Sequence, residues 1–330
     1  MRLATLPRFP LCELPTPLQR AERLEAALGP AAPRIYVKRD DLTGLAFGGN
    51  KGRKLEYLVA DALASGATTL VTEGAAQSNH ARMTAAAAAI AGMRCVLVLD
   101  ARNGADLAGN LLLDRLFGAE TRLVAGKAER RAEMARIGDE LRAAGEVPAV
   151  IPTGGSVPLG AAAYVAATLE LAQQLHDIGE APRRLYVATG SQGTQSGLVV
   201  GRRAYNMPYE VCGIAVEYPR DELVASCVDL ANGTADLLGL DARFDAADVS
   251  IDDGFVGEAY GKPTAGGLEA IRLLAQTEAV VLDPVYSGKA MAALIAHVRA
   301  GAFAPDESVV FVHTGGGPSI FPFGETLLAD

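Results

Sequence analysis

One lysine stands where a glycine-rich loop runs into an expected helix. Lys51 follows the loop from Gly44 to Asn50, and apolar residues with helical spacing come after it, from Leu55 to Leu63. Glycine lets backbone N–H groups approach a ligand closely, and a helix N-terminus favours an anion or a neutral amine. Lys51 is therefore the first candidate for chemistry in this sequence.

Two chemical interpretations of Lys51 compete with a structural one. A phosphate-binding P-loop lysine is followed by Ser or Thr, but Gly52 follows Lys51, so we reject this interpretation. A lysine that forms a Schiff base needs a neutral amine, and burial near a helix start lowers the lysine pKa toward that form. A solvated loop lysine is the structural alternative, because most lysines are exposed. The rest of the chain has to decide between the last two.

Composition sets the class of protein. The chain has 330 residues, half of them hydrophobic, which suggests about two domains with a large core. The net charge of −9 argues against nucleic acid or an anionic membrane as a partner. The four cysteines lack CxxC spacing and the four histidines lack an HExxH pair, so we expect neither a disulfide framework nor a metal site. Without a signal peptide or a membrane-spanning stretch, we expect a cytoplasmic protein.

Short aliphatic runs alternate with helical patterns along the chain, which favours a parallel sheet covered by helices. We expect strands at residues 35–37, 69–72, 95–99, 120–124, 185–188, 211–216, 280–282 and 309–312, and a strand end at 150–152. We expect helices at residues 18–28, 54–65, 81–91, 105–117, 127–142, 159–175, 222–238 and 288–299, and one that begins at 195. The charged helix at 127–142 is interpreted as a solvated face.

Polar or glycine-rich loops follow the expected strands at residues 73–80, 153–156, 189–194, 283–287 and 313–317. Ligands collect at the carboxyl ends of strands in open α/β sheets, so one site is expected where these loops meet. In the loop at 189–194, backbone N–H groups and the hydroxyls of Ser191 and Thr194 suit a phosphate. A plain tight turn is the structural alternative. The glycine spacing does not match a nicotinamide-binding fingerprint.

Six segments, in order along the chain, resemble one family. They are residues 48–57, 77–80, 189–194, 259–264, 283–289 and 313–316. The family is the group of pyridoxal-phosphate (PLP) enzymes of the tryptophan synthase β-type fold that contains D-cysteine desulfhydrase and 1-aminocyclopropane-1-carboxylate (ACC) deaminase. The resemblance covers nearly the whole chain, and it decides for the Schiff-base interpretation of Lys51.

The resemblance implies an α/β fold of type II, with two open twisted parallel-sheet domains, helices on both faces of each sheet and PLP in the cleft between them. Residues 1–48 plus 161–330 would form the large cofactor-binding domain, and residues 49–160 the small domain. A small amino acid would be the substrate. Relatives are homodimers, so we expect a homodimer.

The resemblance also implies roles for individual residues. The expected catalytic residues are Lys51, Ser78, Tyr260 and Tyr286, with Lys51 carrying the Schiff base. The expected cofactor-binding residues are Asn50, Lys51, Asn79 at the ring 3-hydroxyl, Ser191, Gln192, Gly193 and Thr194 at the phosphate, Tyr286 against the ring, Ser287 and Thr314. The expected substrate-binding residues are Ser78, Asn79, His80 and Gly155. The structural alternatives are a helix cap for Ser78 and core positions for the two tyrosines.

The expected partners of the pyridine nitrogen separate the activities of the family. ACC deaminase has a glutamate at the position of Ser287 and a leucine at that of Thr314. Two neutral hydroxyls leave the nitrogen unprotonated, which suits removal of the α-proton followed by prompt β-elimination. We therefore predict conversion of D-cysteine to pyruvate, sulfide and ammonia. The alternatives are an L-cysteate sulfo-lyase, an ACC deaminase and a non-enzymatic PLP-binding homeostasis protein.

Three features depart from the family pattern and bear on the substrate. Relatives commonly carry Thr or a larger residue where this chain has Gly52, so we expect either a wider pocket there or the loss of a contact with the substrate carboxylate. Ala259 replaces a usual glycine, and the segment 217–227 is atypical. Basic residues that would reach a sulfonate, and so favour the sulfo-lyase, are Arg102, Arg220 and Lys262.

Overall fold

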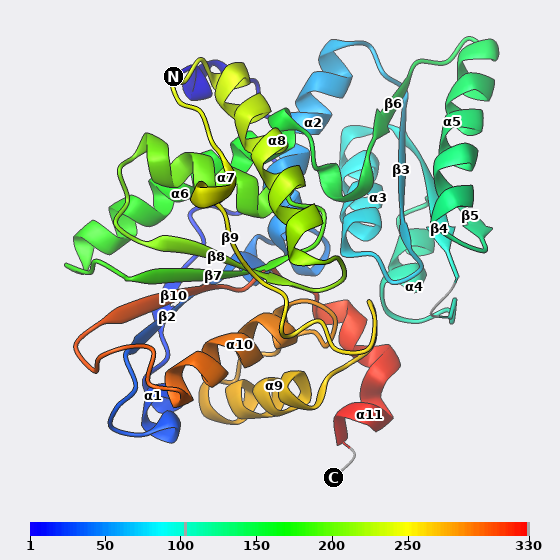
Figure 1. Cartoon of the computed structure of the whole chain (residues 1–330). Coiled ribbons are helices and arrows are strands. Elements are labelled where there is room, and N and C mark those ends of the chain that lie inside the picture. Colours follow the sequence, from blue (N-terminus) through cyan, green and yellow to red (C-terminus); the bar gives the residue numbers. More distant parts are fainter. Residues whose placement is uncertain (102–103, 329–330) are drawn as a thin grey trace.

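The computed structural model describes residues 1–101 and 104–328, which form two open sheets flanked by helices (Figure 1). The six-stranded sheet has the order β1-β2-β10-β7-β8-β9, and the four-stranded sheet has the order β5-β4-β3-β6. All neighbouring strands are parallel except β1 and β2. The predicted fold class, two parallel-rich α/β sheets with helices on both faces, is confirmed.

The bounds of the elements are as follows. The strands are β1 (Leu18–Arg20), β2 (Arg34–Lys38), β3 (Thr69–Ala75), β4 (Arg94–Asp100), β5 (Glu120–Val124), β6 (Pro148–Ile151), β7 (Arg184–Thr189), β8 (Glu210–Ala215), β9 (Ser250–Asp252) and β10 (Ser308–Val312). The helices are α1 (Glu22–Leu28), α2 (Asn50–Ala64), α3 (Asn79–Ala91), α4 (Gly109–Leu116), α5 (Lys127–Ala143), α6 (Pro158–Asp177), α7 (Gly193–Ala204), α8 (Arg220–Leu238), α9 (Ala265–Glu278), α10 (Ser287–Arg299) and α11 (Gly324–Leu328).

The six-stranded sheet is buried on both faces because successive apolar side chains of its strands point alternately to one face and to the other. In β7, Leu185 and Val187 join the core under α6 and α7, whereas Tyr186 joins the opposite core under α9 and α10. In β10, Val310 and Phe311 divide in the same way. Figure 1 shows α6, α7 and α8 on one face of this sheet and α9 and α10 on the other.

The four-stranded sheet follows the same rule. Leu70 and Leu97 pack toward α2 and α3, whereas Val71 and Val96 pack against Ile137 of α5. Helix α2 also packs against α6 of the other half, so it joins the two halves of the molecule. The division into residues 1–48 plus 161–330 and residues 49–160, with one sheet in each, remains a proposal.

Four expectations about elements need correction. Residues 18–28 are not one helix, because Leu18–Arg20 pairs with β2, and a tertiary partner overrides helix propensity. Residues 280–282 are not a strand, because the segment pairs with no strand of the six-stranded sheet and runs as a loop into α10. The helix expected from 105 begins only at Gly109, and the helix at 127–142 buries one face, including Arg130. The sequence patterns do not predict β9 or α9.

Among the described residues, no helix is long and apolar enough to span a membrane. The carboxyl ends of β3, β7, β8 and β10 all point toward the boundary between the two sheets (Figure 1). The polar loops that follow these strands therefore gather at one place, as the sequence predicts.

Candidate active site

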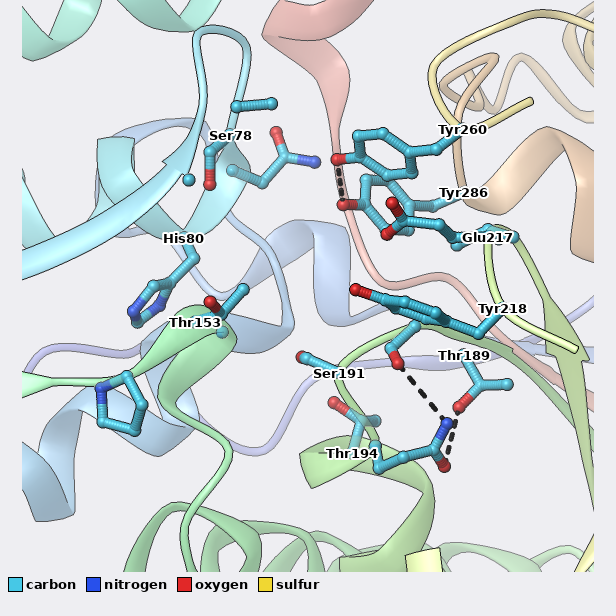
Figure 2. A pocket seen from close by; sticks show the side chains of 18 of the residues that line it. Ser78, His80, Thr153, Thr189, Ser191, Thr194, Glu217, Tyr218, Tyr260 and Tyr286 are labelled. Atoms are coloured by element: carbon cyan, nitrogen blue, oxygen red, sulfur yellow. Dashed lines mark hydrogen bonds between the residues drawn. The ribbon is translucent and has the colours of Figure 1, made fainter. Parts of the chain in front are cut away.

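A cavity of about 730 Å³ lies between the two halves, where these loops meet. The predicted site residues that line it are Asn50, Lys51, Ser78, Asn79, His80, Ser191, Gln192, Thr194, Tyr260, Tyr286 and Thr314. Gly155, Gly193 and Ser287 do not line it. Figure 2 shows Ser78 and His80 on one side of the cavity and Tyr260, Tyr286 and Glu217 on the other.

Lys51 is held by the loop that precedes α2. Gly48 has a φ of +71°, and a side chain there would overlap the backbone of Asp41, so only glycine fits. The next residue, Gly49, pairs with Gly315 after β10, so the loop is tied to the large sheet. Burial lowers the pKa of Lys51 to about 8, which brings the neutral amine within reach of neutral pH.

This pKa predicts the pH dependence of cofactor uptake by the apoprotein. Only the neutral amine adds to an aldehyde, so the uptake rate should rise about tenfold per pH unit below 8 and level off above it. Rapid mixing of apoprotein with PLP between pH 6 and 10, followed by absorbance, measures this profile. A rate that still rises toward pH 10.5, the ordinary pKa of a lysine, would mean that Lys51 is a solvated loop lysine.

The loop after β7 forms a tight cradle at the start of α7. The backbone N–H of Gly193 donates to Ser156 Oγ at 3.2 Å, and Ser156 Oγ donates to Ser191 Oγ at 2.9 Å. Asn50 Nδ2 donates to Thr194 Oγ1 at 2.9 Å, which joins the Lys51 loop to the cradle. Backbone N–H groups and hydroxyls at a helix N-terminus suit a dianion, so this region is chemically fit for a phosphate.

Lys54 is a functional candidate that sequence reasoning missed. Its side chain is fully buried, and its Nζ donates to the Gly154 carbonyl at 3.1 Å. A Cβ on Gly193 would lie 2.6 Å from this Nζ, so the amine stands directly beside the phosphate cradle. Burial, with the Lys51 charge, lowers the Lys54 pKa well below its ordinary value. The i,i+3 spacing of Lys51 and Lys54 was the available signal, because it places both on one face of a helix.

Ser78 and His80 lie at the start of α3. Ser78 Oγ accepts from the Ala81 N–H at 3.2 Å, so Ser78 is the helix cap and also lines the cavity. His80 Nε2 lies 3.1 Å from Thr72 Oγ1, and that hydroxyl donates to the Ile151 carbonyl at 2.7 Å. His80 Nε2 therefore carries the proton, and its buried Nδ1 has no partner among the described residues. Burial lowers the His80 pKa well below its ordinary value, so the ring is neutral.

Tyr260 and Tyr286 form a hydrogen-bonded pair in the cavity wall. Their hydroxyl oxygens are 2.6 Å apart, and their rings meet edge to face with centroids 5.9 Å apart. Burial raises the pKa of Tyr260 to about 12 and that of Tyr286 well above its ordinary value. Both tyrosines are therefore protonated at neutral pH and available as proton donors.

Ser287 and Thr314, the two hydroxyls expected at a pyridine nitrogen, have different environments. Ser287 is fully buried, and its Oγ donates to Asp283 Oδ2 at 2.7 Å and accepts from the Asp283 N–H at 2.8 Å. Thr314 lines the cavity. Of the two, Thr314 is the hydroxyl that a ligand in the cavity reaches.

Gly52 does not widen the cavity, contrary to the first of its two expected effects. A Cβ at this position would lie 2.6 Å from Cys12 Sγ and 3.1 Å from Met83 Cε, so these side chains fill the space. Gly52 itself is buried and does not line the cavity. The space beside Gly52 is therefore filled by packing from Cys12.

This packing predicts a coupled effect on stability. Gly52→Thr should lower the free energy of unfolding by about 1–3 kcal/mol, because it overpacks the space that Cys12 fills. Urea unfolding of Gly52→Thr, Cys12→Ala and the double variant measures the coupling, and the double variant should lose less than the sum of the two single losses. Additive losses would mean that the two residues do not share this space.

The mouth of the cavity contains charged residues that sequence reasoning did not assign to the site. Lys127 of α5 reaches across to the segment after β8, where it forms an ion pair with Glu217 and donates to Tyr218 OH at 2.7 Å. Arg130 lies 3.2 Å from a carboxylate oxygen of Asp100. The atypical segment 217–227 therefore shapes the cavity mouth. Arg220 and Lys262 do not line the cavity, and Arg102 lies outside the described residues.

Comparison with known proteins identifies the class that this fold and site define. A family described as "Pyridoxal-phosphate dependent enzyme" matches residues 10–315, and the chain belongs to this family of PLP-dependent enzymes. Its cofactor is PLP.

Particular relatives narrow the comparison. The chain is 42% identical to the D-cysteine desulfhydrases of Salmonella newport and Salmonella choleraesuis, over 98% of this chain and 99% of each relative. A solved structure described as an ACC deaminase homologue matches with a TM-score of 0.91 and 38% identity, over 99% of this chain and 97% of that one.

The residues of the cavity fit PLP. The cradle at α7 and the buried Lys54 suit the phosphate, and a Cβ on Gly193 would lie 2.7 Å from Ser156 Oγ, so the cradle tolerates only glycine. The Lys51 amine suits the aldehyde, because its lowered pKa favours the nucleophilic form. The cavity is also large enough to hold an amino acid beside the ring.

Proposed function

We propose that this chain is a PLP-dependent carbon–sulfur lyase that converts D-cysteine to pyruvate, sulfide and ammonia. The observation that carries the proposal is the protonated pair Tyr260–Tyr286 in the wall of the Lys51 cavity, 2.6 Å apart and ready to protonate a leaving sulfur. Thr314, a neutral hydroxyl, supports elimination rather than cyclopropane opening. The D-cysteine desulfhydrases that are 42% identical to this chain support the substrate.

The reaction needs four tasks from the chain. PLP, when bound, supplies an electron sink for the substrate α-carbon. Ser78 and the backbone N–H groups at the start of α3 bind the substrate carboxylate, since a helix N-terminus favours an anion. Lys51 would hold the aldehyde of the cofactor and, as a free amine, would take the α-proton of the substrate, and Ser78 is the alternative base. Tyr260 or Tyr286 donates a proton to the departing sulfur, and water then hydrolyses the released enamine to pyruvate and ammonia.

The cavity mouth favours a thiol over a sulfonate as the leaving group. Of the three basic residues of α5 in the lining, Lys127 and Arg130 are already paired with the carboxylates of Glu217 and Asp100, and the third, Arg131, forms no ion pair among the described residues. The Glu217 charge also acts on both site tyrosines, where it raises their pKa values. An anionic β-substituent would therefore meet a carboxylate beside the proton donors, which is unfavourable. This arrangement supports cysteine over cysteate as the substrate.

Product analysis with purified holoenzyme tests the proposal. D-cysteine, L-cysteine, L-cysteate and ACC are supplied separately, and pyruvate, sulfide and sulfite are measured. We expect equal amounts of sulfide and pyruvate from D-cysteine. Pyruvate with sulfite from L-cysteate alone would keep the mechanism but change the substrate. A spectral response without any keto acid would favour the PLP-homeostasis alternative.

We also propose a homodimer. Exposed apolar side chains support it, since Phe47, Leu116 and Phe321 are each more than 60% exposed. They belong to α4 and to two short 3₁₀ segments, Leu45–Phe47 and Gly317–Phe323, and α4 packs against the second of these. Exposed apolar side chains on neighbouring segments, here α4 and Gly317–Phe323, mark protein contacts. Sedimentation should give twice the mass of the chain, and a single-chain mass at micromolar concentration would contradict the proposal.

A cytoplasmic location is part of the same proposal. The four cysteines are free thiols, which is usual where the environment is reducing. The expected partner is a small amino-acid substrate.

A further inference from the structure

Arg82 of α3 is a fully buried cation that contacts Asn79, a residue of the cavity lining. Its side chain is fully buried, and among the described residues no carboxylate lies within ion-pair distance. Burial lowers the Arg82 pKa to about 10, and only the more distant charges of Asp114 and Asp283 oppose this effect. Burying an arginine without a direct ion pair is costly, so its hydrogen bonds have to be specific.

These hydrogen bonds join three elements that surround the cofactor site. Nη1 donates to Asn79 Oδ1 at 3.0 Å and to Asn110 Oδ1 of α4 at 2.7 Å. Nη2 donates to the Gly48 carbonyl at 2.8 Å, in the loop that sets the position of Lys51. One guanidinium therefore connects the start of α3, the start of α4 and the lysine loop.

The same contacts fix the orientation of the Asn79 amide. Its Oδ1 also accepts from Asn110 Nδ2 at 2.9 Å. The Asn79 amide cannot flip, because Arg82 carries only donors and therefore requires the amide oxygen, not the nitrogen, on its side. Asn79 lines the cavity, and its Nδ2 donates to no acceptor among the described residues. The free donor of Asn79 is therefore the group presented to a ligand.

We propose that Arg82 is a positioning residue for the cofactor ring: it locks Asn79 so that Nδ2 donates to the ring hydroxyl oxygen, and it holds the Gly48 carbonyl that leads to Lys51. The proposal rests on the proposed function and on the position of Asn79 at the ring 3-hydroxyl, which the family resemblance implies. A donor at the ring oxygen favours its ionised form and weakens its hold on the Schiff-base proton of Lys51. Arg82 thereby sets the protonation of that Schiff base without touching the cofactor.

The test is a pH titration of the Schiff-base absorbance in the holoenzyme, read without substrate. Asn79→Ala and Arg82→Met should each raise the titration midpoint, by about one to two pH units for Asn79→Ala, because the ring oxygen becomes more basic. Arg82→Met should produce at least half of that shift. Adding Arg82→Met to Asn79→Ala should produce no further shift, because both changes remove the same interaction.

Arg53→Met is the matched control, because Arg53 is an equally buried arginine whose hydrogen bonds go to Asp40 and Glu170 and not to the cavity. It should lower stability and leave the titration unchanged. If Arg82→Met does not fold, Arg82→Lys decides, because one ammonium cannot replace the bonds to both Asn79 and Gly48.

Three results at the two arginines would overturn the inference: an unchanged midpoint in a folded Arg82 variant, an additive shift in the double variant, or an equal shift in the Arg53 control. An unchanged midpoint in Asn79→Ala would also overturn it. Sulfide release from D-cysteine by the same protein would then show that the proposed function still stands.

Discussion

Lys51→Ala is expected to reduce kcat for pyruvate formation at least about 10²–10⁴-fold, the range that one positioned acid–base group supplies. We expect a loss of kcat at or above the upper end of that range, because Lys51 both binds the cofactor and moves the α-proton. Its lowered pKa of about 8 is the property that suits both tasks. The visible absorbance of the Schiff base should disappear in the same variant, while the phosphate cradle should still retain PLP.

The measurement is steady-state pyruvate release from D-cysteine, with absorbance spectra of the cofactor-loaded protein. Lys262→Ala is the matched control, because Lys262 is an exposed lysine outside the cavity lining. It should retain wild-type turnover. Near wild-type kcat in Lys51→Ala would contradict the mechanism and direct attention to Lys54, one helical turn further along α2.

Lys54→Met is expected to weaken PLP binding by about 10–100-fold, the effect of losing a charge-assisted hydrogen bond to the phosphate. Without the cofactor, the amine is fully buried beside the Gly154 carbonyl, and its pKa is lowered well below the ordinary value. Replacing it by an apolar side chain of similar length removes a desolvation cost. The apoprotein should therefore be at least as stable as the wild type.

Titration of the apoprotein with PLP and with pyridoxal, which lacks the phosphate, separates the two possible causes of weaker binding. The affinity for pyridoxal should be the same in the wild type and in Lys54→Met. An equal loss of affinity for both ligands would mean that the substitution disturbs the cavity as a whole. Thermal unfolding of the apoprotein checks the stability statement independently.

Much of the site was predictable because its residues lie in short segments after strands. Loops at the carboxyl ends of parallel strands must converge, so the chain segments around Ser78, Ser191 and Thr314 were expected together. The sequence allows two roles for Ser78, a helix cap or a substrate-binding residue. In the structure Ser78 caps α3 and also lines the cavity.

The features that the sequence does not predict depend on contacts between residues far apart in the chain, which no local pattern encodes. Cys12 fills the space beside Gly52 although it lies 40 positions earlier in the chain. The sequence around Gly52 therefore does not show that this space is occupied. Lys127 and Glu217 meet across the cavity mouth from different halves of the molecule. The burial of Arg82 and Lys54 similarly follows from how α2 and α3 pack. Residues 280–282 look like a strand locally, but they pair with no strand of the six-stranded sheet.

Reduction of the holoenzyme with borohydride, followed by peptide mass mapping, tests the central claim most directly. The reagent fixes PLP to the lysine that carries it, and cleavage after Arg53 places Lys51 and Lys54 in different tryptic peptides. We predict one phosphopyridoxyl group per chain, on the peptide that contains Lys51. The same group on Lys54, or on a lysine outside the cavity, would contradict the site described above.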